Sequence, residues 1–121
     1  MARHREQRRA ARIQPFVAAC RVLAAGERLV GYVTDLSTEG CQVATQSPPP
    51  ALAATVVLEI RLGRGAAHTR LPARVIWTRA RSTSSGADTF GLVFDGLDDA
   101  QRRALGEVVE AFRRKAAEID G

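Results

Sequence analysis

The sequence predicts a mainly β protein: a small six-stranded antiparallel β-barrel of the Greek-key or split type, with a C-terminal α-helix and a flexible basic N-terminal arm. Three observations indicate this class. About six short apolar segments are separated by turn-rich connections, one apolar stripe at helical spacing follows them, and arginines crowd the first residues. At 121 residues the chain can form one core but not two. We therefore expect an arm over residues 1–14 and a single barrel-plus-helix domain over residues 15–121.

The arm carries most of the net charge of the chain. Five arginines and one glutamate within residues 3–12 account for four of the five net positive charges. Like charges at this density repel one another and cannot bury apolar surface, so the arm is expected to be mobile without a ligand. Its ordinary interpretation is a solvated segment or a nonspecific anion patch.

Two strands are expected next, joined by a turn at residues 25–27. From Pro15 the apolar residues alternate, and they fall on one face at Phe16, Ala18, Cys20 and Val22. The second strand is predicted over residues 28–34, and Gly31 within it indicates a bulge or tight bend.

A polar turn at residues 35–40 leads into a third strand at residues 41–45. Asp35 and Ser37 suit such a corner because each can bond to nearby backbone and offer an oxygen to a ligand, and we expect both to face outward. Gly40 allows a positive φ or the close approach of another group. The prolines at residues 48–50 then predict an exposed loop, with proline-motif binding as an alternative.

Three further strands are expected, over residues 55–62, 69–79 and 89–94. The first alternates apolar and polar residues, so one face is buried. The glycines after it lack the third glycine and the helix of a phosphate-binding loop. In the second, one face is shared by Leu71, Ala73, Val75 and Trp77.

A helix is predicted to end the chain. Asp98 is its expected N-cap, because Gln101 three residues later completes a capping box. Its apolar stripe consists of Leu105, Val108, Val109, Phe112 and Ala116. The stripe is expected to pack on the barrel, and a dimer contact through the same face remains open.

No constellation in the sequence points to catalysis or to a metal. Cys20 and Cys41 are too far apart in sequence for a metal-ligand pair and fit two small buried residues, and His4 and His68 are isolated. Paired acids and a nucleophile with its base are absent from the sequence pattern. No apolar run reaches membrane-spanning length, and the polar start lacks the apolar stretch of a signal peptide. We therefore expect a cytoplasmic binding protein, not an enzyme, without a metal or cofactor.

Two short patterns in fixed order resemble the signatures of the PilZ domain family, bacterial receptors for the second messenger cyclic di-GMP. Arg-x-x-x-Arg stands at residues 8–12, and Asp-x-Ser-x-x-Gly stands at residues 35–40. The segments at residues 73–77 and 90–94 are similar to the closing strands of the family, and a helix follows. The resemblance extends from about Gln7 to about Phe112.

The resemblance implies a cyclic di-GMP site, with no other cofactor, formed when the arm folds over the barrel. Its expected ligand-binding residues are Arg8, Arg9, Arg12, Asp35, Ser37, Gly40 and Trp77. Arginine pairs bidentately with phosphate or with guanine O6 and N7, and a carboxylate accepts from the N–H donors of guanine. For Trp77 two roles stay open, a core side chain or a ring that stacks on guanine.

The implied protein is a stand-alone adaptor, a monomer or weak dimer, that signals through an unidentified downstream protein. Two other classes stay open. One is a barrel that binds nucleic acid through the basic arm, against which stands an aromatic content of only 5%. The other is a PilZ-like interaction module that does not bind nucleotide, against which stand the intact motifs.

Overall fold

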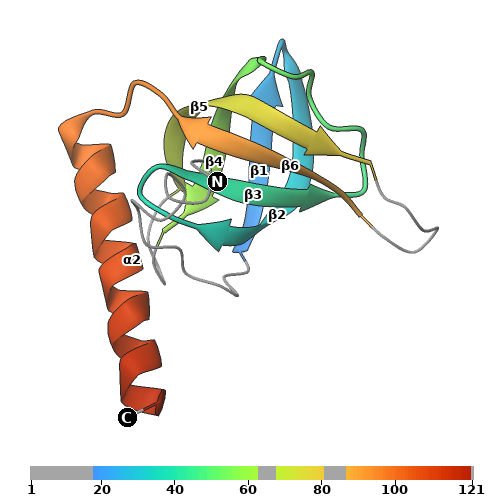
Figure 1. Ribbon diagram of the computed structural model, residues 1–121. Coiled ribbons are helices and arrows are strands. Elements are labelled where there is room, and N and C mark those ends of the chain that lie inside the picture. The colour runs from blue at the N-terminus through green and yellow to red at the C-terminus, as the bar shows by residue number, and fades with distance from the viewer. Residues whose placement is uncertain (1–17, 63–67, 81–86, 121) are drawn as a thin grey trace, which may run out of the picture.

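The computed structural model describes residues 18–62, 68–80 and 87–120, and the side chains of these up to residue 114. The elements are β1 (Ala18–Ala24), β2 (Glu27–Leu36), β3 (Gly40–Thr45), β4 (Thr55–Arg61), β5 (His68–Arg79), β6 (Asp88–Phe94) and α2 (Asp99–Asp120). All neighbouring strands are antiparallel, and they close into a barrel in the order β1-β2-β3-β6-β5-β4 (Figure 1). The predicted six-stranded antiparallel barrel with a C-terminal helix is confirmed, and the predicted arm over residues 1–14 lies outside the described residues.

The barrel interior is filled by the inward-facing residues of every strand. The largest fully buried side chains on the strands are Val22, Val33, Leu36, Val43, Val56, Leu58, Ile60, Leu71, Val75, Phe90 and Leu92. Burying one such aliphatic or aromatic side chain contributes about 1.5–3 kcal/mol of transfer free energy. Cys20 and Cys41 belong to this core as free thiols, as the sequence predicted.

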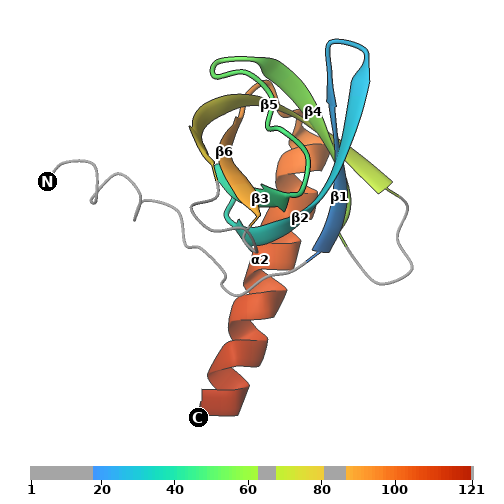
Figure 2. The ribbon, with the colours of Figure 1, turned by 90° about the vertical axis from the view of Figure 1, so that its right-hand side faces the viewer.

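Among the described side chains of α2, those that join the core lie in the first half of the helix. Leu105 and Val109 are buried against the barrel, and Val108 is partly buried, so the predicted stripe is confirmed there. Figures 1 and 2 show the helix beginning beside the barrel and extending beyond it toward its C-terminus. The side chain of Ala116, also predicted in the stripe, lies outside the described residues.

The helix start is fixed by the predicted capping box. The backbone N–H of Gln101 donates to Asp98 Oδ1 at 2.7 Å, and the N–H of Asp98 donates to Gln101 Oε1 at 2.7 Å. Gln101 Nε2 also donates to the carbonyl of Arg70 at 2.6 Å. The cap therefore anchors α2 on β5 as well as satisfying its first donors.

The strand β2 differs from the sequence prediction in two ways. It continues through Leu36, so Asp35 lies in the strand and not in the turn. Its bulge is at Thr34, where the register with β3 shifts, and not at Gly31. Gly31 pairs regularly with Thr45 on β3. Its lack of a side chain lets the backbone of Ala44 come close, because a Cβ at Gly31 would lie 2.6 Å from the carbonyl oxygen of Ala44.

Candidate functional site

The turn between β2 and β3 is organised by the hydroxyl of Ser37. Ser37 Oγ accepts hydrogen bonds from the backbone N–H groups of Glu39 and Gly40, both at 3.1 Å, and donates to the carbonyl of Gly40 at 3.3 Å. The N–H of Ser37 donates to the same carbonyl at 2.9 Å. The residue is only 3% exposed. The expectation that Ser37 faces outward was therefore wrong, because its oxygen is used to close the turn.

Gly40 is needed for contact between strands. A Cβ at this position would collide with the carbonyl oxygen of Leu92 on the neighbouring β6. The expected close approach to Gly40 is thus confirmed, and the group that approaches is backbone of the barrel.

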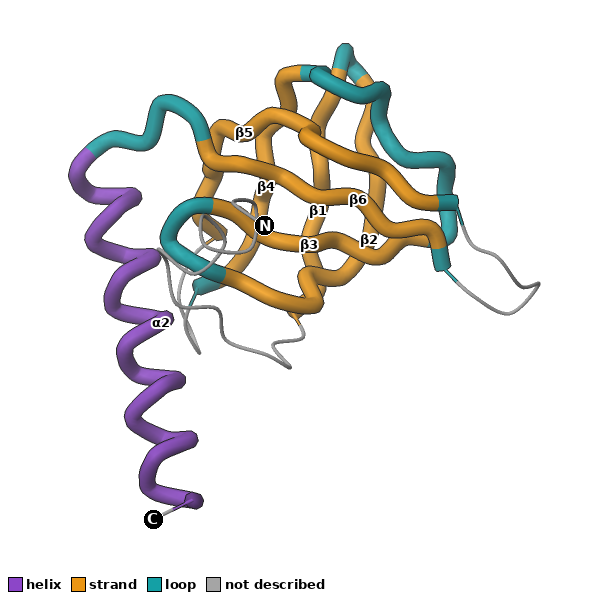
Figure 3. Tube along the Cα trace, in the orientation of Figure 1, coloured by secondary structure: helices purple, strands orange, loops and turns teal. Residues whose placement is uncertain are grey.

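A row of residues crosses the outer wall beside this turn. Asp35 on β2 pairs with Gln42 on β3, Gln42 pairs with Gly91 on β6, and Gly91 pairs with Trp77 on β5. Asp35, Gln42 and Gly91 precede or follow buried core residues, namely Leu36, Cys41 and Leu92, so these three row positions project from the outer surface. We call Asp35, Gln42, Gly91 and Trp77 the recognition row; its strands lie side by side in Figure 3.

Asp35 is in this row but is largely covered. It is 7% exposed, so it does not stand freely in solvent as the sequence suggested. The bulge at Thr34 is the reason for its direction, because one extra residue on β2 places Asp35 opposite Gln42 while Val33 remains in the core.

Trp77 lies on the outer wall and not in the core. The register with β6 shifts between Val75 and Trp77, so strict alternation fails after Val75. The indole ring covers the place where a Cβ of Gly91 would stand. The Arg79 guanidinium lies 5.6 Å from the centroid of that ring, within the range of a cation–π contact. The expectation that Trp77 shares a face with Leu71, Ala73 and Val75 was therefore wrong.

The structure brings four of the predicted site residues into one region. Asp35, Ser37 and Gly40 belong to the turn and its flanking strands, and Trp77 completes the row on the same wall. Arg8, Arg9 and Arg12 lie outside the described residues, as does Phe16.

Two neighbours of these residues were missed in the sequence. Gln42 stands two positions after Gly40, and Arg79 stands two positions after Trp77. In each case the period of two along a strand would have found the residue once its partner was known to face outward.

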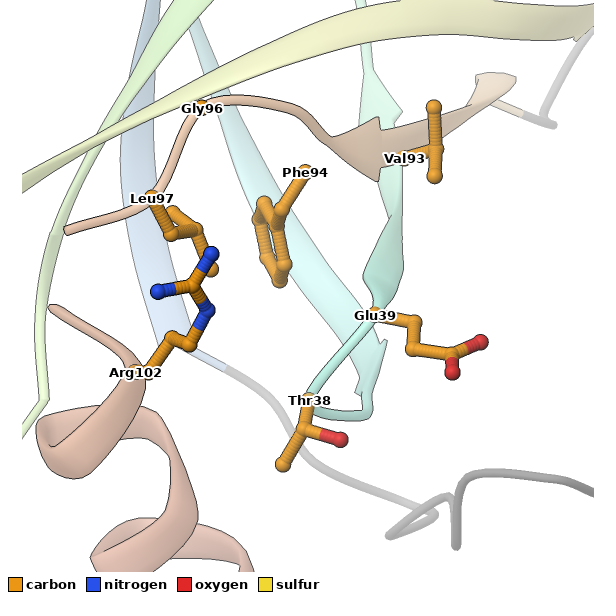
Figure 4. A pocket seen from close by; sticks show the side chains of 7 residues that line it. All are labelled: Thr38, Glu39, Val93, Phe94, Gly96, Leu97 and Arg102. Carbon is orange, nitrogen blue, oxygen red and sulfur yellow. The ribbon is translucent and has the colours of Figure 1, made fainter. Parts of the chain in front are cut away.

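A hollow of about 460 Å³ borders the turn on the side of the helix. Its walls are formed by Thr38, Glu39, Val93, Phe94, Gly96, Leu97 and Arg102 (Figure 4). The carbonyl of Glu39 accepts a hydrogen bond from the N–H of Phe94 at 2.9 Å, so the turn is fixed to the end of β6. The turn therefore contacts the recognition row on one side and the approach to α2 on the other.

The opposite wall carries a row of charges. Glu59 on β4 accepts from Arg70 Nε at 2.8 Å and from Arg21 Nη1 at 3.4 Å, and the three residues pair across β1, β4 and β5. The hydrogen bond from Arg70 is the main cause that lowers the pKa of Glu59; desolvation opposes it, and a smaller contribution from Arg21 adds to the lowering. We call Arg21, Glu59 and Arg70 the charge row.

Other chemistry is scarce in the part of the chain that the structure describes. Burial raises the pKa of the Cys20 thiol to about 11, which makes this thiol a poor nucleophile. Among the described residues there is no group of three or more histidine, cysteine, aspartate or glutamate side chains placed to hold a metal. Within the same residues, no helix has the length and apolar character needed to cross a membrane.

Comparison of the sequence with known proteins identifies a family. The sequence matches the PilZ domain family over residues 5–111. No curated protein matches the sequence.

Solved structures share the fold. The PilZ domain of YcgR from Escherichia coli, determined with c-di-GMP, has a TM-score of 0.75 at 20% identity, over 94% of this chain and 97% of that one. The Bacillus subtilis inhibitor of motility MotI/DgrA has a TM-score of 0.72 at 17% identity, over 92% of this chain and 52% of that one. The K. pneumonia MrkH–c-di-GMP complex has a TM-score of 0.75 at 18% identity, over 92% and 54%. The chain thus spans about half the length of MotI and MrkH.

Proposed function

The chain belongs to the PilZ domain family, and from that premise we propose that it is a receptor for cyclic di-GMP that signals through a protein partner. The observation that carries the proposal is the recognition row, which joins the Asp-x-Ser-x-x-Gly turn to Trp77 on one outer wall. Two of the solved structures that share the fold, YcgR and MrkH, were determined with c-di-GMP, which supports this ligand.

The residues match the chemistry of the ligand. Cyclic di-GMP presents two phosphodiester charges and two guanines. The carboxylate of Asp35 accepts from N1–H and the 2-amino group of guanine, and the indole of Trp77 offers a flat surface on which a base stacks. Arg79, next to that ring, adds a planar cation on the same wall.

Arg8, Arg9 and Arg12 supply the second half of the proposed site. Their guanidinium groups pair with phosphate oxygens or with O6 and N7 of guanine. Without ligand, the mutual repulsion of the arm disfavours its docking on the barrel. The two phosphates offset that repulsion, so binding shifts the population toward a docked arm by as much as the ligand prefers that state.

Ser37 and Gly40 act on the ligand mainly through the turn. The hydroxyl of Ser37 holds the turn closed, and Gly40 lets β3 approach β6. Together they fix the end of β2 and hence the position of Asp35. A direct contact of Ser37 with phosphate is compatible with this role if the hydroxyl rotates away from the carbonyl of Gly40.

The output of the receptor is proposed to be a contact with another protein. Docking of the arm changes the surface around the recognition row and the neighbouring turn, and the turn also borders the hollow at the start of α2. A partner that reads either surface would sense the ligand without any catalytic step in this chain.

The test is calorimetric titration of the full chain with cyclic di-GMP. Arg8→Ala, Arg12→Ala and Asp35→Ala are each expected to weaken binding by about tenfold or more, because a hydrogen bond to a charged group contributes roughly 1.5–3 kcal/mol. Arg103→Ala, which removes an exposed arginine of α2, is the matched control and should bind like the native chain. Native binding that none of the three substitutions alters would refute the proposed site.

A further inference from the structure

The recognition row contains one side-chain amide, that of Gln42 on β3. Gln42 projects from the outer face of β3, because its neighbours Cys41 and Val43 are both in the core. It is half-buried, and it stands between Asp35 on one neighbouring strand and Gly91 on the other.

The space beside Gln42 is shaped by the missing side chain of Gly91. Because Gly91 has no Cβ, the pyrrole side of the Trp77 indole, including Nε1, lies over it. The ring thus reaches one strand closer to β3 than its own backbone does. With strands about 4.8 Å apart, the amide of Gln42 is one strand from the carboxylate of Asp35 and one strand from the place covered by the indole.

The backbone at Gln42 is held from the side of β2. Thr34, the extra residue of the bulge, donates from Oγ1 to the carbonyl of Gln42 at 3.4 Å. The same bulge sets Asp35 opposite Gln42. The relative position of the carboxylate and the amide is therefore a built feature of the sheet.

We propose that Gln42 is a specificity-determining residue of the site, donating a hydrogen bond from its amide to O6 of the guanine whose N–H donors Asp35 accepts. The inference rests on the proposed function and goes beyond it by assigning how guanine is distinguished from adenine. A carboxylate can only accept, whereas the amide also donates. Adenine has an acceptor at N1 and no 2-amino group, so the carboxylate of Asp35 mismatches it and holds only guanine in the position where the Gln42 amide meets the acceptor O6.

The experiment is a titration of the full chain with cyclic di-GMP and with cyclic di-AMP. Gln42→Leu keeps the bulk of the side chain and removes the amide, and it is expected to weaken cyclic di-GMP binding about tenfold while binding of cyclic di-AMP stays within about twofold of native, so that the ratio of the two affinities falls. Gln42→Glu, which keeps the acceptor, loses the donor and adds a negative charge beside Asp35, should weaken cyclic di-GMP binding further.

The control is Gln46→Leu, which removes an exposed glutamine just beyond the end of β3 and should leave both affinities unchanged. Circular dichroism and thermal unfolding establish that each variant is folded. A merely structural role of Gln42 would change both affinities together or neither.

The outcomes separate this inference from the function on which it rests. If Asp35→Ala weakens cyclic di-GMP binding and both Gln42 variants bind it within about twofold of native, Gln42 has no such role and the receptor proposal stands. An equal loss for both nucleotides likewise overturns the assignment of specificity. If the native chain binds neither nucleotide, the proposed function itself is wrong.

Discussion

Two outer walls of the same barrel carry rows of polar side chains, and the rows differ in kind. The charge row places Glu59 between Arg21 and Arg70, so every charge faces its opposite on the neighbouring strand. The recognition row places a carboxylate, an amide, a glycine and an indole side by side. The first row consists of paired opposite charges; the second combines different chemical groups at fixed spacing.

The difference teaches which wall is suited to a ligand. Internal pairing consumes the hydrogen-bonding capacity of Glu59, whose side chain is only 11% exposed beneath its arginines. The recognition row combines an acceptor, a donor and a flat apolar surface, the three elements needed to read a base. Two bulges, at Thr34 and Ile76, direct its ends outward, and the charge row has no register shift.

The largest expected effect is a loss of stability on substitution of Gly40, which supports the recognition row by letting β3 pack closely against β6. Gly40→Ala forces a Cβ against the carbonyl oxygen of Leu92, and the backbone of β3 or β6 must move. We expect unfolding free energy to fall by about 3 kcal/mol, at the upper end of overpacking costs. Gly106→Ala on α2, where a Cβ meets nothing within 4 Å, is the matched substitution and should stabilise by up to about 1 kcal/mol. Urea denaturation measures both, and equal effects would contradict the tight packing assigned to the turn.

The next effect concerns ligand affinity at the far end of the row. Trp77→Ala removes the stacking surface and should weaken cyclic di-GMP binding about tenfold, since stacking of one base on an aromatic ring contributes roughly 1–3 kcal/mol. Ile76→Ala changes the preceding residue, which is half exposed, and should leave affinity within about twofold. Calorimetry on both variants checks the pair. Normal binding by Trp77→Ala would confine the ligand site to the turn.

Much of this architecture is readable from the sequence, because periodicity reports burial directly. The six strands and the helix were predicted close to their observed bounds, and the Asp98 capping box was found from its spacing alone. These features are local, and each depends on residues within a few positions of one another.

The sequence predictions were wrong at three positions, where a bulge, a contact between strands or a closed turn determines the structure. Alternation placed Trp77 on one face with Leu71, Ala73 and Val75, because the bulge at Ile76 has no signature in the sequence. Gly31 was expected to mark a bulge, but its missing Cβ instead allows the carbonyl of Ala44 on β3 to approach closely. Ser37 was expected to face outward. The hydrogen bonds that bury its hydroxyl form only in the closed turn, and the sequence does not show them. The arginines of the arm lie outside the described residues, so their role stays a prediction.

The charge row gives the stability of the protein a dependence on pH. Its hydrogen bonds lower the pKa of Glu59 below the ordinary value of 4.5 in the folded state. The stability that Glu59 contributes is therefore complete above pH 4.5 and is lost as the pH falls through the lower, folded-state pKa. Glu59→Gln should flatten the acid limb of a plot of melting temperature against pH and leave cyclic di-GMP affinity unchanged. An acid limb identical to that of the native protein would contradict the assignment.

The smallest effect distinguishes the two arginines of the charge row from each other. Arg70 is nearer to Glu59 than Arg21 is, at 2.8 Å against 3.4 Å, although its side chain is 70% exposed against 46%. If hydrogen-bond geometry outweighs exposure, Arg70→Ala raises the pKa of Glu59 more than Arg21→Ala does, as followed by NMR titration of the carboxylate carbon. High salt should shrink both differences, because solvent-exposed guanidinium groups are readily screened. A larger rise in the pKa of Glu59 from Arg21→Ala would mean that the lower exposure of Arg21 outweighs its longer distance to the carboxylate. In either order, unchanged affinity for cyclic di-GMP in both variants is required if the two walls are independent.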